Sequence, residues 1–171
     1  MKVMDAITGR RSIRNFSHVE VEQEKLNLVL EAARLAPSAA NGQIWKFIIV
    51  KDSATRGKIA AASGGQNFIK EAPVIIIACA EENSIVMLCG QYRYTVDLSI
   101  AMSFMILEAY EQGLGSCWIG HFKEDDVKRI LGIPQDVRIV ALTPLGYPAE
   151  SPMQRPRKAQ KEIVCYEKYH K

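Results

Sequence analysis

The stretch Arg10–Phe16, which reads Arg-Arg-Ser-Ile-Arg-Asn-Phe, places three arginines around one serine hydroxyl. Guanidinium groups bind phosphate through paired N–H donors, and a serine hydroxyl or a backbone N–H adds further donors. A basic run near the start of a chain is also typical of a solvated surface or of structural ion pairs. The stretch becomes informative when it is read with a second block, Pro37–Phe47, which reads Pro-Ser-Ala-Ala-Asn-Gly-Gln-Ile-Trp-Lys-Phe.

The composition is that of an ordinary globular protein. The 171 residues, of which 48% are hydrophobic and 24% charged, suffice for one sizeable core. No run of 18 or more apolar residues is present, and the first residues lack the apolar core of a secretion signal. The net charge of +3 is too small to require nucleic acid as a partner. We therefore expect a single cytoplasmic domain over residues 1–171, with no membrane association.

Cysteine and histidine show no metal-binding pattern. The four cysteines, Cys79, Cys89, Cys117 and Cys165, contain no Cys-x-x-Cys pair, and their spread fits reduced thiols of a cytoplasmic protein. The histidines are isolated, which favours surface or structural roles. A Rossmann-type dinucleotide site is also excluded. The glycines of residues 113–120 do not have the spacing of that motif, and they come after a predicted helix instead of a strand.

Interleaved helical and strand-like patterns predict an α+β protein with a mixed or antiparallel central sheet flanked by helices. We expect helices over residues 4–10, 21–36, 54–62, 94–111 and 125–131, and strands over 47–50, 74–80, 116–119 and 137–142. The remaining segments are expected to be a connector at 66–70, a loop at 81–91 and a turn at 144–148.

Two of these segments carry more information than the others. The continuous apolar run at 74–80 is typical of a central strand that is buried on both faces. The segment 94–111 is apolar on most sides, which indicates a helix buried in the core or at a subunit interface. We interpret Asp97, the polar exception near the start of this helix, as a structural carboxylate.

Several segments together meet the requirements of flavin binding. A phosphorylated flavin needs an anion site, hydrogen-bond partners for its pyrimidine edge, a donor near N5 and apolar cover for its ring. Glycine permits close approach of backbone to such a ring. The candidates are Arg10, Arg11, Ser12, Arg14, Arg155 and Arg157 for the phosphate, Ser38, Asn41 and Gln43 for the polar edge, and the backbone of Ile119 and Gly120 for the ring.

The order and spacing of these blocks resemble the FMN-dependent nitroreductase family. The matching blocks, in chain order, are Arg10–Phe16, Ala33–Trp45, Gly113–Gly120, Leu145–Pro148 and Arg155–Lys158. The resemblance implies a nitroreductase-like fold and a homodimer with two FMN sites at the subunit interface. It also implies that the helix at 94–111 lies in that interface and that the tail, residues 149–171, wraps the partner subunit.

The resemblance further implies which residues meet FMN. Arg10, Ser12 and Arg14 would bind the phosphate, completed by Arg155 or Arg157, whereas Arg11 would reach either the phosphate or the isoalloxazine. Ser38 and Asn41 would come from the partner subunit, in a loop shaped by Pro37 and Ala39. The backbone N–H near Gly120 would address N5, and Gln66 or Asn67 would also reach the flavin.

The activity implied by the resemblance is that of an FMN-dependent oxidoreductase with ping-pong turnover. NADH or NADPH would deliver a hydride, and a small acceptor such as a nitroaromatic or a quinone would then be reduced. The short loop at 81–91 implies an open pocket. The alternatives are a dehalogenase-like or flavin-fragmenting enzyme, an oxidase, and a protein that stores or senses flavin. A nucleic-acid binder is disfavoured, because the basic segments lack interleaved aromatic residues.

Overall fold

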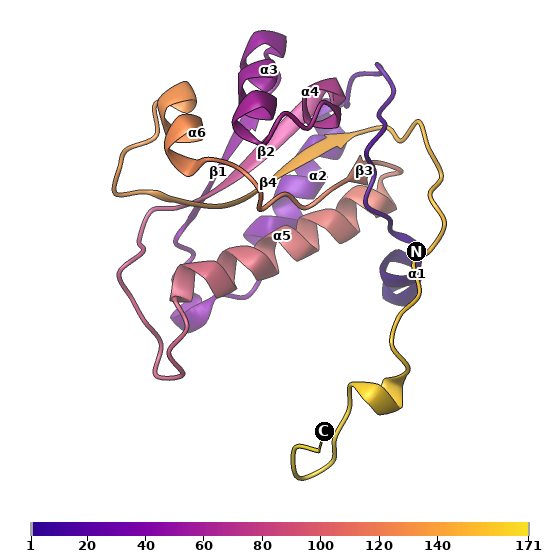
Figure 1. Cartoon of the computed structure of the whole chain (residues 1–171), viewed down its shortest axis with the longest axis vertical. Helices are drawn as coiled ribbons and strands as arrows, with labels where there is room; N and C mark the ends of the chain where they lie inside the picture. The colour runs from indigo at the N-terminus through magenta and orange to yellow at the C-terminus, as the bar shows by residue number, and fades with distance from the viewer. Residues whose placement is uncertain (1, 171) are drawn as a thin grey trace.

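The computed structural model describes residues 2–170 and contains an antiparallel sheet at its centre (Figure 1). The strands are β1 (Trp45–Val50), β2 (Val74–Ala80), β3 (Gly115–Ser116) and β4 (Arg138–Gly146), in the spatial order β1-β2-β4-β3. Every residue of β2 is buried between its neighbours. The sequence prediction of an α+β fold with a central strand at 74–80 is confirmed.

Helices cover both faces of this sheet (Figure 1). One face carries α3 (Ser53–Ala62), α4 (Phe68–Glu71) and α6 (Glu124–Leu131), and the other carries α2 (Gln23–Arg34) and α5 (Arg93–Glu111). The short α1 (Val3–Gly9) lies beside the C-terminal end of α5, and η1 (Ala39–Asn41) follows α2. The sheet is therefore the middle of three layers.

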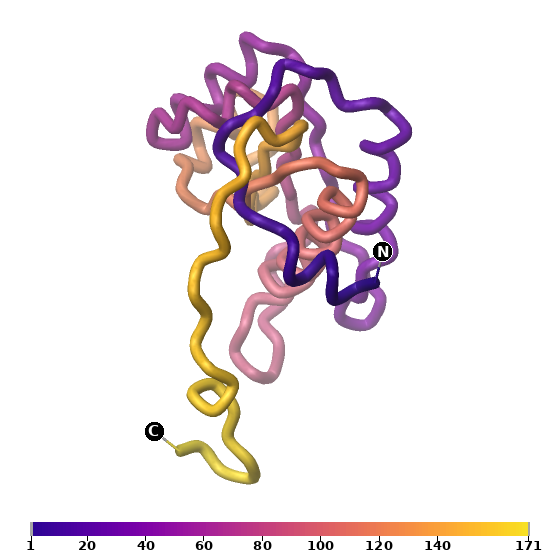
Figure 2. The backbone as a smooth tube through the Cα atoms, turned by 90° about the vertical axis from the view of Figure 1, so that its right-hand side faces the viewer, coloured from indigo at the N-terminus to yellow at the C-terminus, as the bar shows by residue number. Residues whose placement is uncertain are grey.

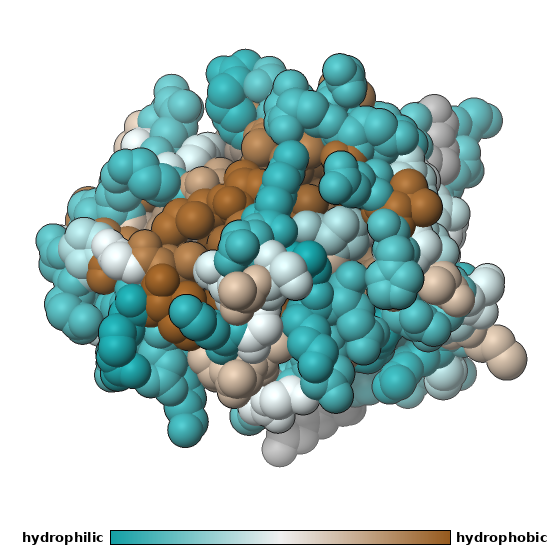
Figure 3. Space-filling view, turned by 90° about the horizontal axis from the view of Figure 1, so that it is seen from above, coloured by the Kyte–Doolittle hydropathy of each residue, from teal (hydrophilic) through white to brown (hydrophobic). Residues whose placement is uncertain are grey.

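The alternation of side chains along β2 produces two hydrophobic cores. Ile75 and Ile77 pack with α3 and α6, whereas Ile76 and Ala78 pack with α2 and α5. Viewed from the side of α3 and α6, the molecule shows an apolar strip between polar side chains (Figure 3). Asp52 caps the N-terminus of α3, because its side chain accepts the N–H of Thr55 at 2.7 Å.

Three local predictions differ from the structure. Residues 68–71 form the one-turn helix α4, where a connector was expected over 66–70. The predicted strand 116–119 is shorter, because β3 ends at Ser116 and only Ile119 bridges to β4 beyond it. β4 continues through Pro144, where a turn was expected. A proline is tolerated at this position because β3 pairs only with Leu145 and Gly146, so β4 has no neighbouring strand on that side at Pro144.

The C-terminal tail leaves the body of the molecule (Figures 1 and 2). Ala149 is still bonded to Asn15, after which the chain extends past α1 and forms only the short η2 (Gln160–Glu162). Its apolar side chains at Met153, Tyr166 and Tyr169 are at least 80% exposed. Residue 171, the last of the predicted tail, lies outside the described residues. None of the helices in residues 2–170 is long and apolar enough to cross a membrane.

Candidate flavin site

The stretch Arg10–Phe16 is an extended loop fastened on two sides. On one side Ile13 donates its N–H to Ser116 of β3 at 3.0 Å, and Gly115 lies so close that a Cβ there would be 2.6 Å from Ile13. On the other side Asn15 accepts the N–H of Ala149 at 2.9 Å. The loop is therefore held between β3 and the segment that follows β4.

The predicted phosphate residues lie around one hollow. A cavity of about 400 Å³ opens between the loop and the first part of the tail. Its lining includes Arg10, Arg11, Ser12, Arg14, Arg155 and Arg157. The two basic segments are about 140 positions apart in the sequence, and the fold brings all six candidates together. The resulting concentration of positive charge is suited to an anion.

Arg10 carries the clearest sign of a missing partner. Its Nε is buried and has no hydrogen-bond partner among residues 2–170. Buried N–H groups are nearly always paired, so an unpaired guanidinium N–H beside an arginine-lined cavity indicates an acceptor from outside the chain. A phosphate group provides such an acceptor, and the donor set of the cavity fits it.

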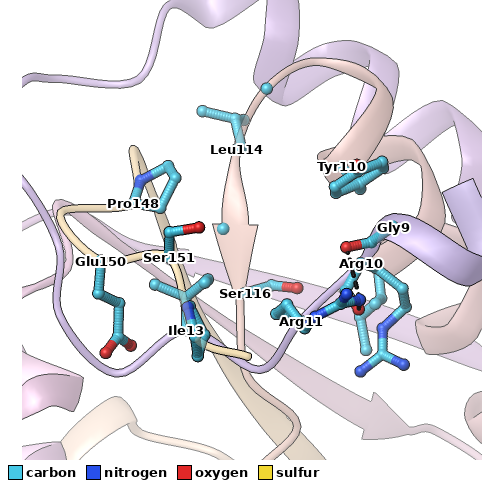
Figure 4. Close-up of a pocket in the computed structure, with 14 residues that line it drawn as sticks. Gly9, Arg10, Arg11, Ile13, Tyr110, Leu114, Ser116, Pro148, Glu150 and Ser151 are labelled. Carbon is cyan, nitrogen blue, oxygen red and sulfur yellow. Dashed lines mark hydrogen bonds between the residues drawn. The ribbon is translucent and has the colours of Figure 1, made fainter. Parts of the chain in front are cut away.

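Arg11 differs from Arg10, because one of its guanidinium nitrogens is already bonded to backbone carbonyls. One terminal nitrogen, Nη1, donates to the carbonyls of Thr8, Gly9 and Arg10 at 2.8, 2.8 and 2.9 Å. These bonds satisfy carbonyls at the end of α1 that lack partners within the helix. Figure 4 shows the side chain turned back toward Gly9. Arg11 therefore lines the cavity, but its hydrogen bonds stabilise the C-terminal end of α1.

Glu150 is a residue that the sequence analysis missed. Its Oε1 accepts the backbone N–H groups of Arg14 and Asn15, the latter at 3.1 Å. It lines a second cavity of about 260 Å³ together with Arg10 and Tyr110, and in Figure 4 its carboxylate points away from the two arginines. Glu150 and Arg14 are 136 positions apart in the sequence, so no local sequence motif could have indicated this contact.

Local contacts fix the segments that carry the remaining flavin candidates, Gln66 and Gly120. The Arg14 guanidinium lies 6.0 Å from the centre of the Phe68 ring, which places it near residues 66 and 67. Ile119 and Leu142 of β4 form two backbone hydrogen bonds, of 2.9 and 3.0 Å. These bonds fix the backbone immediately before the exposed Gly120. The side chain of Gln66 donates to the carbonyl of Ser63 at 2.9 Å.

Cysteine chemistry is disfavoured in this region. Burial raises the pKa of the Cys117 thiol, although the neighbouring Arg14 guanidinium acts in the opposite direction. Burial also raises the pKa of Cys79 to about 11. Both thiols therefore stay protonated near neutral pH and are poor nucleophiles. Among residues 2–170 there is also no cluster of side chains that could hold a metal ion.

The loop Ser38–Gln43 lies far from the arginine cavity in the folded chain. Ala39 is bonded to Asp97 in the first turns of α5, whereas the arginine loop lies beside Tyr110 at the other end of that helix. Tyr110 is 13 helical positions beyond Asp97, which corresponds to about 20 Å along α5. Figure 1 shows the same separation, with η1 and α1 at opposite ends of α5. One chain therefore does not bring Pro37, Ser38, Ala39, Asn41 and Gln43 to the arginine cavity.

This loop has an unusual backbone. Ala40, Asn41 and Gln43 have φ of 49°, 53° and 49°, in the left-handed region that is costly for residues other than glycine, by roughly 1–3 kcal/mol each. Gln43 donates its N–H to the Ser38 hydroxyl at 3.1 Å. The side chains of Asn41 and Gln43 are exposed, so the loop presents polar groups to an external partner.

Comparisons with known proteins show what this chain is similar to. The family model described as "Nitroreductase family" matches residues 7–84 and 61–147. A protein of Methanothermobacter thermautotrophicus, provisionally named NADH dehydrogenase/NAD(P)H nitroreductase, is 36% identical over 91% of this chain and 82% of its own length. The FMN reductase [NAD(P)H] of Bacillus subtilis is 30% identical over 98% of this chain and 74% of its own.

A solved structure shows the same arrangement of elements. The crystal structure of a nitroreductase family protein from Clostridium novyi NT superimposes with a TM-score of 0.84 at 34% sequence identity, and the match covers 91% of this chain and 89% of that one. Both the sequence and the fold are therefore shared along most of the chain.

Proposed function

This chain belongs to the nitroreductase family of oxidoreductases, and we propose that it binds FMN and takes electrons from NADH or NADPH. The observation that carries the cofactor proposal is the cavity between Arg10–Arg14 and Arg155–Arg157, with the unpaired Nε of Arg10 beside it. The FMN reductase of Bacillus subtilis, whose similarity extends over nearly the whole chain, supports the same activity.

The complete site is proposed to form only in a homodimer. The arginine loop of one subunit and the loop Ser38–Gln43 of the other would meet across the interface, because the two lie about 20 Å apart along α5 of one chain. The exposed apolar side chains of Val3, Met4 and Phe104 support an interface on α1 and α5. The extended tail is proposed to wrap the partner subunit.

Bound FMN supplies hydride and electron transfer, which the side chains of this protein need not perform. Arg10, Arg14 and the Ser12 hydroxyl would hold the phosphate, completed by Arg155 or Arg157. The backbone of Gly120, fixed by Ile119, would donate toward the ring, and Gln66 would lie at its side. Asn41 and Ser38 of the partner subunit would bond the pyrimidine edge. These groups would orient the ring and stabilise negative charge on it.

The acceptor is proposed to be a small flat molecule such as a nitroaromatic or a quinone. No catalytic side chain is assigned, since the buried thiols stay protonated and the redox chemistry would belong to the cofactor. The nicotinamide and the acceptor would occupy the same open pocket in turn. This alternation predicts ping-pong kinetics, with parallel lines in a double-reciprocal plot.

The test is an absorbance spectrum of the purified protein, followed by anaerobic addition of NADH or NADPH. Flavin bands that bleach and then return on addition of a quinone or a nitroaromatic are the expected result. Bands that stay oxidised would contradict the electron donors and leave a flavin-binding protein. The absence of flavin, even after FMN is supplied, would overturn the cofactor proposal.

A further inference from the structure

A buried ion pair in the first turns of α5 holds the loop Ser38–Gln43 by its backbone. Asp97 Oδ1 accepts the N–H of Ala39 at 3.0 Å, and Arg93 Nη2 donates to the carbonyl of the same residue at 2.7 Å. Arg93 Nε also reaches Asp97 Oδ2 at 3.3 Å. Both backbone polar groups of Ala39 are thus fixed by one pair of side chains.

The pair and the loop are in direct contact. The side chains of Arg93 and Asp97 are 13% and 2% exposed, so little solvent reaches them. A Cβ atom at Gly42 would lie 1.3 Å from Nη2 of Arg93, which means that the guanidinium occupies the space of a side chain at that position. Gly42 is therefore required for this contact between the loop and the pair.

The Arg93–Asp97 pair restrains the backbone next to three residues with unfavourable φ angles. Ala40, Asn41 and Gln43 all have positive φ, which a free peptide of these residues rarely adopts. Such conformations persist only where the surroundings impose them, and they cluster at functional sites. Ala39 precedes the first of the three, so fixing its N–H and carbonyl sets the direction in which the strained segment leaves α2.

Stability alone does not explain this pair. Removing two charges from water costs about as much as their attraction returns, and a buried ion pair is weak evidence for stability. Its particular contribution is geometry, because a planar guanidinium and a carboxylate fix the groups they bond in distance and angle. The loop that they fix carries the exposed amides of Asn41 and Gln43.

We propose that Arg93 and Asp97 are positioning residues, which hold Ala39 so that Asn41 and Gln43 meet the polar edge of the flavin bound by the partner subunit. This inference rests on the proposed function. Hydrogen-bond partners are effective only when they are held close to the required geometry by a second layer of contacts. Loss of the pair is therefore expected to change flavin affinity and reduction potential, beyond any change in melting temperature.

The test compares Asp97→Asn and Arg93→Lys with the control Glu124→Gln. Glu124 is a matched carboxylate in the other helical layer; it accepts the N–H of Ile139 at 2.8 Å and pairs with Arg138 at 3.0 Å. Four quantities are measured for each protein: the Kd for FMN, the midpoint potential of the bound flavin, the melting temperature, and amide hydrogen exchange over residues 38–43.

For Asp97→Asn we expect at least a tenfold rise in the Kd, a potential shift larger than that of the control, and faster exchange over residues 38–43. Arg93→Lys keeps the charge but loses the planar fork, so a smaller change in the same direction is expected. If both variants only lower the melting temperature, as the control does, the positioning role is wrong.

The hydrogen-exchange measurement separates the two proposals. If the wild-type protein binds no FMN, the proposed cofactor is overturned, whereas exchange over residues 38–43 still judges the ion pair. Unchanged exchange in Asp97→Asn would overturn the positioning role, whether or not the protein holds a flavin.

Discussion

At the scale of single residues, Arg14 tests the proposed phosphate site. Its side chain is exposed and lines the cavity, and its guanidinium lies 6.0 Å from the centre of the Phe68 ring. A charge-assisted hydrogen bond contributes about 1.5–3 kcal/mol. Arg14→Ala is therefore expected to weaken FMN binding roughly 10- to 150-fold, with little change in melting temperature. A fluorescence titration with FMN measures this, and unchanged affinity would exclude Arg14 from the phosphate site.

Arg11 is expected to respond in the opposite way. Its three bonds to the carbonyls of Thr8, Gly9 and Arg10 support the end of α1, so Arg11→Ala should lower the free energy of unfolding by about 1–2 kcal/mol. Its FMN affinity should fall much less than that of Arg14→Ala. Urea denaturation and the same titration separate the two effects. An equal loss of FMN in both variants would place Arg11 at the phosphate.

At the scale of elements, the predictions succeeded where burial imposes a pattern. The strand at 74–80 and the helix at 94–111 are long and apolar, and both are present almost as expected. The one-turn α4 was missed, because four residues carry no helical period. The end of β3 and the path of β4 through Pro144 depend on which strand lies alongside, and no local pattern contains that information.

The candidate site likewise contains residues that local sequence patterns indicate and residues that they do not. Arginines in two separate blocks were expected at one anion site, because basic side chains are visible in the sequence, and they do line one cavity. That they bind a phosphate there stays a prediction. Glu150 and the Arg93–Asp97 pair could not, since each acts on backbone groups more than 50 positions away. The pairing of Asp97 with Arg93 agrees with the structural role expected for that carboxylate.

Gly115 in β3 connects the sheet to the arginine loop. Because a Cβ there would lie 2.6 Å from Ile13, Gly115→Ala should displace the loop and lower the free energy of unfolding by about 1–3 kcal/mol. Gly57→Ala in α3 is the control; its Cβ would meet nothing within 4 Å, so it should stabilise the helix by about 0.5–1 kcal/mol. Thermal denaturation tests both, and equal melting temperatures would contradict the close approach.

Glu124 couples α6 to β4 in a pH-dependent way. Partial burial alone would raise its pKa, but the N–H of Ile139 and the Arg138 guanidinium outweigh it and hold the pKa below the ordinary value of 4.5. The folded state therefore gains stability above pH 4.5, and that gain is lost as the pH falls through the lowered pKa. Glu124→Gln should flatten this acidic part of the stability curve, as measured by urea denaturation between pH 3 and 6. A curve parallel to that of the wild type would contradict the coupling.

At the scale of the whole molecule, three features agree with the proposed homodimer. Val3, Ala32, Phe104 and Leu107 line an apolar hollow of about 330 Å³ between α1, α2 and α5. The tail extends away from the body with its apolar side chains exposed (Figure 2). The two predicted halves of the flavin site lie at opposite ends of α5. A second copy of the chain would cover the hollow, receive the tail and complete two sites at once.

Phe104 tests this arrangement, because it lies on the exposed side of α5 and is 40% exposed. A charge there would be buried without a partner in the dimer but solvated in the monomer. Phe104→Glu is therefore expected to halve the mass measured by light scattering and to lose most of the bound FMN. Val19→Glu, at a 57% exposed site away from α5, should leave both unchanged. A Phe104→Glu protein that stays dimeric and fully loaded would place the interface on another surface.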